Sequence, residues 1–93
     1  MRKKKRSKLL IIADILEYLL REGGEDYATR IATGTGLAYD RLSKLLEELN
    51  SKGIVRIRNE DGRKLVEITE KGVKLLEHIQ KLSSVIRDFG LDL

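Results

Sequence analysis

Basic side chains gather at the amino terminus, where they could bind a polyanion through charge alone. Six of the 19 basic groups are Arg2, Lys3, Lys4, Lys5, Arg6 and Lys8. The rest of the chain has 13 basic groups against 15 acidic ones, a net charge of −2, although the whole chain carries +4. The sequence therefore predicts a cationic arm on a nearly balanced domain, and such an arm is attracted to polyanions. A solubilising terminus without a partner is the alternative.

Groups that could carry catalysis or hold a metal are scarce. The 93 residues contain no cysteine and a single histidine, His78. Thiolate metal sites and disulfides are therefore excluded, and no carboxylates cluster with ligand spacing. The serines have no base within a recognisable motif, so nothing supports nucleophilic catalysis. We expect no enzymatic activity, no metal, no cofactor and no evident small-molecule ligand.

The glycines Gly34 and Gly36 could belong to a phosphate-binding loop or to a turn between two helices. A dinucleotide-binding loop would need a third glycine at the position of Tyr39 and a preceding strand, whereas a helical pattern precedes this stretch. The turn is the better interpretation, because glycine permits the left-handed backbone and the close approach that two crossing helices need.

Hydrophobic periodicity predicts four helices around this turn. We expect them over about 8–22, 27–33, 39–51 and 70–89. Ser7 and Thr69 are suitable amino-terminal caps for the first and the last of these helices. A helix, a tight turn and a further helix in this order form a helix-turn-helix.

Between the third and fourth helices the period changes to two, which predicts strands over about 54–58 and 65–68. Asp61-Gly62 between them indicates a β-hairpin, with a loop that looks longer than two residues. The hairpin would be a two-stranded wing. The predicted fold class is mainly α with a small β-hairpin (α+β), a winged helix-turn-helix with a C-terminal dimerisation helix.

The stretch TRIATGTGLAYDRLSKLLEELNSKGIV (29–55), followed by VEITEKGVKLLEHI (66–79), resembles the small archaeal winged helix-turn-helix transcriptional regulators. It is also similar to the dimeric archaeal chromatin-associated proteins that share this domain. The similarity extends from about Ser7 to Ile86, and its most specific element is Thr69-Glu70-Lys71-Gly72 after a hairpin. Ala38 departs from the pattern, because the family usually has serine or asparagine as the cap of the recognition helix.

This resemblance implies a protein that binds double-stranded DNA. The helix from Tyr39 would be the recognition helix in the major groove, and the wing and the arm would contact the backbone. The residues expected to contact DNA are Arg2, Lys3, Lys4, Lys5, Thr29, Arg30, Tyr39, Asp40, Arg41, Ser43, Lys44, Arg56, Arg58, Arg63 and Lys64. The alternatives are a solvated face of an amphipathic helix and the exposed side of an amphipathic hairpin.

The last helix carries a second apolar pattern. Its seam residues, separated by 4, 3, 4 and 3 positions as in a coiled coil, are Leu75, Ile79, Leu82, Ile86 and Phe89. A helix of roughly 20 residues is about 30 Å long, more than so small a domain can cover. The sequence therefore predicts a homodimer. A helix that folds back over 8–22 in a monomer is the alternative.

Together these patterns divide the chain into a basic arm (1–6), a winged helix-turn-helix domain (7–69) and a coiled-coil-like dimerisation helix (70–93). No apolar run approaches the roughly 20 residues of a membrane span, and no cleavage-site pattern follows the basic start. We expect a soluble, cytoplasmic, nucleoid-associated regulator of transcription that binds DNA as a dimer. A winged helix that serves as a protein-protein interaction module in a transcription or other multi-subunit assembly is the alternative function.

Overall fold

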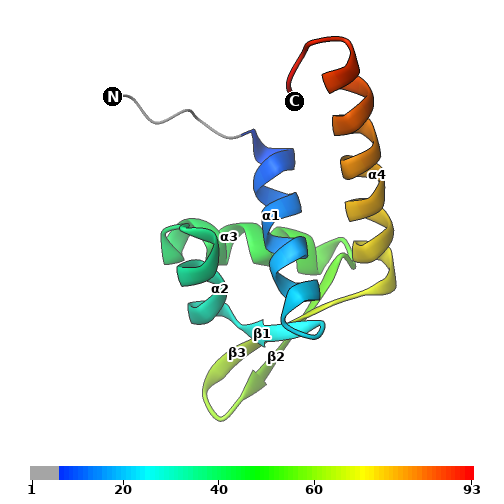
Figure 1. Cartoon of the computed structure of the whole chain (residues 1–93). Helices are drawn as coiled ribbons and strands as arrows, with labels where there is room; N and C mark the ends of the chain where they lie inside the picture. The colour runs from blue at the N-terminus through cyan, green and yellow to red at the C-terminus, as the bar shows by residue number, and fades with distance from the viewer. Residues whose placement is uncertain (1–6) are drawn as a thin grey trace.

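The computed structural model describes residues 7–93 as four helices and a three-stranded antiparallel sheet (Figure 1). The elements are α1 (Lys8–Arg21), β1 (Glu25–Tyr27), α2 (Ala28–Thr35), α3 (Tyr39–Ser51), β2 (Val55–Glu60), β3 (Arg63–Ile68) and α4 (Glu70–Asp88). The predicted winged helix-turn-helix fold is confirmed. The arm and its predicted DNA contacts, Arg2, Lys3, Lys4 and Lys5, lie outside the described residues.

The wing is larger than the predicted hairpin, because a third strand joins it. β1 pairs antiparallel with β3, with Tyr27 opposite Leu65, so the strand order is β1-β3-β2. A strand of three residues is too short to show alternation in the sequence. Its position has a structural consequence, since it attaches the start of α2 to the middle of the wing.

The loop of the hairpin has two residues, so the expectation of a longer one is wrong. Glu60 pairs with Arg63, and only Asp61 and Gly62 lie between them. Their φ angles are 52° and 77°, which a two-residue hairpin turn with both central residues in the left-handed region requires. The chain supplies this geometry with an Asp-Gly pair, a common choice for such turns.

The two glycines near the helix-turn-helix corner have different roles. Gly36 has a φ of 72° and ends α2 in the left-handed conformation, as predicted for the turn. Gly34 lies inside α2, so its assignment to the turn is wrong. A Cβ atom at Gly34 would lie 2.3 Å from Cε2 of Tyr18, so glycine is needed there for α1 and α2 to pack closely.

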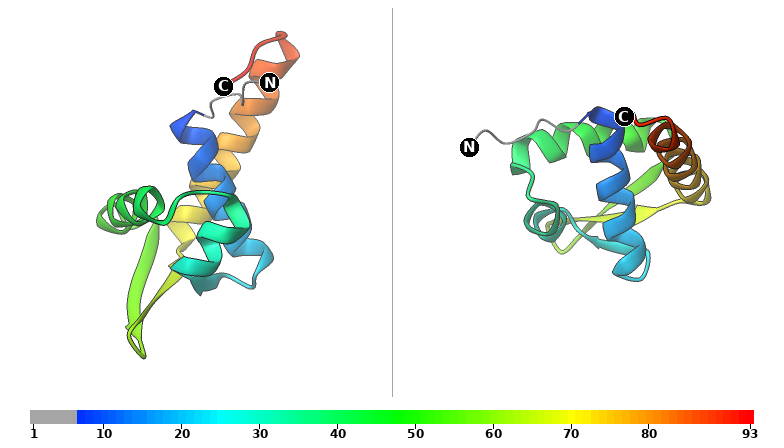
Figure 2. Two further views of the ribbon diagram at one scale, coloured as in Figure 1. Left: turned by 90° about the vertical axis from the view of Figure 1, so that its left-hand side faces the viewer. Right: turned by 45° about the horizontal axis from the view of Figure 1, so that its top comes forward.

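The core forms where α1 crosses the other helices and the sheet. Its fully buried side chains come from every helix except α4 and from both long strands: Ile15, Leu16, Leu19, Ile31, Leu42, Leu46, Leu49, Val55 and Val66. Leu76 and Ile79 of α4 close the core from the other side. The distal turns of α4 extend away from the sheet, beside α1 (Figures 1 and 2). Within residues 7–93, no helix has the length and apolar character needed to span a membrane.

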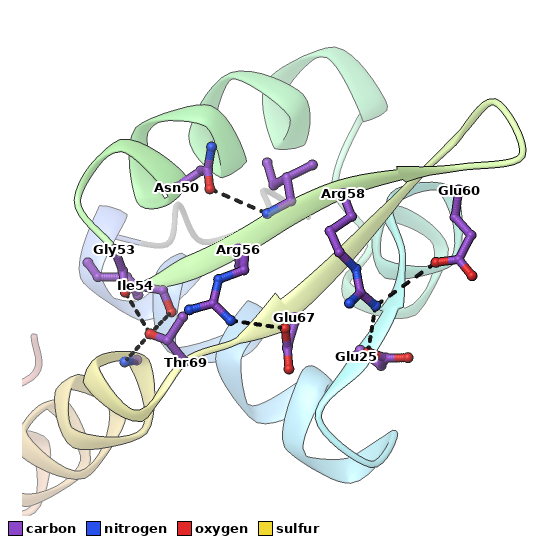
Figure 3. Close-up of polar contacts among 11 residues, drawn as sticks. Glu25, Asn50, Gly53, Ile54, Arg56, Arg58, Glu60, Glu67 and Thr69 are labelled. Atoms are coloured by element: carbon purple, nitrogen blue, oxygen red, sulfur yellow. Dashed lines mark hydrogen bonds and ion pairs between the residues drawn. The ribbon is translucent and has the colours of Figure 1, made fainter.

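A clip, formed by Thr69, Lys71 and Gly72, joins the start of α4 to residues 52–54, which follow α3. The Thr69 hydroxyl lies 2.6 Å from the Gly53 carbonyl, its nearer acceptor, and 2.9 Å from the Ile54 carbonyl (Figure 3). It accepts from the Gly72 N–H at 3.1 Å, which confirms Thr69 as the helix cap. Lys71 Nζ donates to the carbonyl of Lys52 at 2.7 Å. The Thr-Glu-Lys-Gly motif therefore bonds the start of α4 to the segment between α3 and β2.

Candidate nucleic-acid interface

The predicted recognition helix, α3, separates a buried side from a solvent side. Leu42, Leu46 and Leu49 are buried in the core. On the opposite side Tyr39, Asp40, Arg41 and Lys44 are exposed, and Ser43 is half-buried. Ala38 makes no side-chain hydrogen bond to the start of the helix, because its methyl group has no acceptor.

Two cations on the solvent side of α3, Arg41 and Lys44, have no acidic partner among residues 7–93. Within the described part of the chain, neither Arg41 nor Lys44 forms an ion pair. The acidic Glu48, in contrast, is bound by Lys8 at 2.9 Å, and this hydrogen bond lowers the pKa of the Glu48 carboxyl. The contact also attaches the first turn of α1 to α3. The accessible charge on the amino-terminal half of α3 is therefore set by Asp40, Arg41 and Lys44.

Contacts between α3 and the hairpin hold the wing in place. Lys64 Nζ lies 3.4 Å from the Ser43 hydroxyl and 3.8 Å from a Glu47 carboxylate oxygen. At the base of the wing, the Asn50 side-chain oxygen accepts a hydrogen bond from the Ile57 N–H at 3.3 Å (Figure 3). The recognition helix and the wing thus form one connected surface.

Two predicted wing contacts, Arg56 and Arg58, are engaged by carboxylates on the sheet (Figure 3). Arg56 pairs with Glu67 at 3.5 Å, and Arg58 lies 3.5 Å from Glu25 and 4.0 Å from Glu60. All of these side chains are largely exposed, and such ion pairs contribute at most about 1 kcal/mol. These carboxylates nevertheless cancel the positive charge on this side of the wing.

Arg30 is also engaged, in a hydrogen-bonded group that the sequence analysis did not single out. Asp26 accepts from the Tyr18 hydroxyl at 2.6 Å and lies 3.2 Å from Arg30. Burial raises the pKa of Asp26, but the bonds from Tyr18, the Tyr27 N–H and Arg30 together outweigh it and hold the pKa below its ordinary value. The same bond raises the pKa of Tyr18. The spacing of Asp26 and Arg30, four residues apart, is the feature of the sequence that could have indicated this ion pair.

Replacing Tyr18 with phenylalanine is expected to lower the free energy of unfolding by about 2 kcal/mol at neutral pH, because the ionised Asp26 loses a hydrogen bond. The ring that packs on Gly34 is kept. Since the pKa of Asp26 is depressed on folding, its charged form stabilises the protein above the ordinary value of 3.8, and this contribution disappears as the pH falls through the folded pKa.

Urea unfolding measures this difference at about pH 6 and about pH 2, and we expect it to shrink at the lower pH. Tyr39→Phe is the matched control, since the exposed Tyr39 lies outside this group. A difference of equal size at both pH values would contradict the role of the ionised carboxylate.

Four predicted DNA contacts from distant parts of the chain line a single cleft of about 240 Å³. Thr29 comes from α2, Tyr39 from α3, and Arg63 and Lys64 from β3. The guanidinium of Arg63 stacks on the ring of Tyr27, with Cζ 3.7 Å from the ring centroid. The arrangement depends on β1, which brings Tyr27 beside the wing.

The predicted dimer seam is divided along α4. Ile79 is buried in the core of its own domain, and Leu75 is partly buried against that core. Farther along, Ile86 is half-buried, whereas Leu82 is 47% exposed and Phe89 is 78% exposed. Exposed apolar residues that the heptad pattern did not include are Val85 and Leu91.

Known proteins share this fold. The family described as winged helix-turn-helix matches residues 5–87. Sso10a-2, a DNA-binding protein from Sulfolobus solfataricus, is 32% identical and superposes with a TM-score of 0.82 over 90% of this chain and 85% of its own. Sco5413, a MarR family transcriptional regulator from Streptomyces coelicolor, is 23% identical, with a TM-score of 0.77 over 88% of this chain and 58% of its own.

A further similarity is to part of a much longer protein. Over 58 residues the chain is 40% identical to the phenylalanine–tRNA ligase alpha subunit of Metallosphaera sedula. The match covers 62% of this chain but only 12% of the ligase subunit. Together with the match over residues 5–87 and the order of helices and strands, these comparisons establish that the chain belongs to the winged helix-turn-helix family, with a fold shared by DNA-binding proteins and transcriptional regulators.

Proposed function

We propose that the protein binds double-stranded DNA as a homodimer and regulates transcription, with α3 in the major groove. The observation that carries this proposal is the solvent side of α3, where Arg41 and Lys44 have no acidic partner within the described residues. Arginine and lysine read guanine edges or contact phosphates, and residues near the start of a recognition helix reach the bases. Tyr39, Asp40 and Ser43 lie on the same side and would add hydrogen bonds. The likeness to Sso10a-2, a DNA-binding protein, supports it.

Contacts to the DNA backbone would come from three places. The basic arm at 1–6, with Arg2, Lys3, Lys4 and Lys5, would release counterions without a fixed geometry. Thr29, Arg63 and Lys64 would act from the cleft beside α3. Arg30, Arg56 and Arg58 form ion pairs, so they would contact the DNA backbone only after these ion pairs break.

The dimer would form through the distal part of α4, in the segment 70–93 that follows the winged helix-turn-helix domain at 7–69. Leu82, Val85, Phe89 and Leu91 present a large apolar surface to solvent in the single chain. Covering each of them would contribute on the order of 1.5 to 3 kcal/mol. The half-buried Ile86 lies beside them, whereas Leu75 and Ile79 would support the helix from the domain side.

The similarity to a ligase subunit favours a second candidate function. The phenylalanine–tRNA ligase alpha subunit is, by its name, part of a multi-subunit protein, and a segment of it is 40% identical to this chain. The second candidate is therefore a winged helix that serves as a protein-protein interaction module in such an assembly. In that case the solvent side of α3 would contact polypeptide instead of DNA.

The salt dependence of binding separates the two functions. If the arm, the cleft and α3 together neutralise about four phosphates, raising the salt concentration from about 50 to about 200 mM should weaken binding to duplex DNA roughly 100-fold. Fluorescence anisotropy with a labelled duplex measures this change. Absence of saturable binding at the lower salt concentration would favour the interaction module.

A further inference from the structure

We infer that the cleft between α2, α3 and the wing is a binding site for one phosphodiester group of the nucleic acid backbone, with Arg63 as the main residue that binds it. This inference rests on the proposed DNA-binding function and assigns one site within it. The cleft has a volume of about 240 Å³, and its walls come from three separate elements. The bound group would touch α2, α3 and the wing at once.

The residues that line the cleft include two cations and no carboxylate. They are Tyr27, Ala28, Thr29, Tyr39, Asn59, Gly62, Arg63 and Lys64. Three further cations outside α3 were predicted to bind DNA from the helix-turn-helix and the wing. They are Arg30, Arg56 and Arg58, and each of them is paired with an acidic side chain. Lys64 is itself paired with Glu47 of α3 at 3.8 Å, so Arg63 is the cation of the cleft that no acidic side chain of the described residues neutralises.

The stack on Tyr27 prepares Arg63 for an anionic oxygen. Cζ of Arg63 lies over the Tyr27 ring, and a contact with the face of a ring leaves the N–H donors of a guanidinium for other partners. Within the described residues the Arg63 side chain forms no ion pair. A side chain that is already held in position loses less conformational entropy when it binds, which strengthens binding.

The lining groups favour a phosphate over a base as the occupant. Arg63 lies over the Tyr27 ring, which removes that face as a stacking platform for a nucleobase. The remaining lining groups that can donate to an anionic oxygen are the hydroxyls of Thr29 and Tyr39 and the ammonium of Lys64. Lys64 is held at the edge of the cleft through its contact with Ser43 on α3. This set of donors suits a backbone phosphate, which is the same for every base sequence.

Duplex binding by Arg63 variants tests the assignment, with Arg21→Ala as the control. Arg21 is exposed at the end of α1, beside α4, and is not among the predicted DNA contacts. We expect Arg63→Ala to weaken binding about 10- to 100-fold for all duplex sequences and to reduce the slope of log affinity against log salt by about 1. Arg63→Lys should recover the slope but only part of the affinity, because a point charge lacks the planar donor set. Arg21→Ala removes one exposed charge away from the proposed site and should change affinity less than about threefold.

A series of duplexes, each with a single phosphate replaced by a neutral methylphosphonate, identifies the phosphate that occupies the proposed site. Replacing the phosphate at one position should weaken binding of the wild-type protein. The same replacement should not weaken binding of the Arg63→Ala variant any further. If the wild-type protein binds with the expected salt dependence but Arg63→Ala binds as tightly as Arg21→Ala, the phosphate site is wrong and the proposed function stands. The same conclusion follows if no phosphate position shows this behaviour. If the wild-type protein does not bind duplex DNA at low salt, both the proposed function and the proposed phosphate site are wrong.

Discussion

Replacing Gly72 with alanine is expected to lower the free energy of unfolding by about 3 kcal/mol. The added Cβ would lie 2.3 Å from the carbonyl oxygen of Ile54 and 2.9 Å from Cγ1 of Ile68. That carbonyl accepts a hydrogen bond from the Thr69 N–H at 3.2 Å, so it cannot move away without weakening this bond. The gain in helix propensity from alanine, about 1 kcal/mol, is smaller than this combined loss.

Urea unfolding at a fixed protein concentration measures the effect, with Gly90→Ala as the control. Gly90 has a φ of 78° and no neighbouring atom within 4 Å of a Cβ, so alanine there incurs backbone strain alone, about 1 kcal/mol. If Gly72→Ala is no more destabilising than Gly90→Ala, the close contact between α4 and the end of α3 does not hold in solution.

Replacing Leu82 and Phe89 together with glutamate is expected to turn a dimer into a monomer. Both side chains are exposed in the single chain, so the change leaves its core intact. Losing their burial on both subunits should raise the dissociation constant by a factor on the order of 10⁴ or more, and the buried charges would add to this. Sedimentation equilibrium should give twice the chain mass of 10.6 kDa for the wild-type protein and a single chain mass for the variant.

Ser84→Glu is the control for this experiment, because Ser84 is exposed on the same helix but outside the predicted seam. It should remain dimeric. A wild-type protein that sediments as a monomer would contradict the dimer itself. Equal dissociation of the Ser84→Glu protein would show that the contact does not follow the seam.

The helices could be predicted from the sequence because their signals are local. The apolar period of α1, α3 and α4 and the caps Ser7 and Thr69 lie within each element, and the structure confirms both caps. β1 could not be predicted, because three residues carry no period and its partner lies about 40 positions away. Gly34 was misassigned for a similar reason, since the ring of Tyr18 that requires it comes from another helix.

The candidate site was predictable only as a set of exposed residues. Periodicity correctly separates the solvent side of α3 from its buried side. It does not reveal which cations are neutralised, because Arg58 meets Glu25 across 33 positions of sequence. Nor does it reveal the stack of Arg63 on Tyr27, which exists only because β1 pairs with β3.

The clip at Thr69, Lys71 and Gly72 couples the start of α4 to the segment that follows α3. If the protein forms the proposed dimer, a change in the angle at which the two copies of α4 cross would alter the tilt and separation of the two α3 helices. For a dimer that reads two half-sites, the preferred number of base pairs between them would then be encoded in α4, far from the DNA. Substitutions along α4 could shift that spacing while leaving every DNA-contacting side chain unchanged.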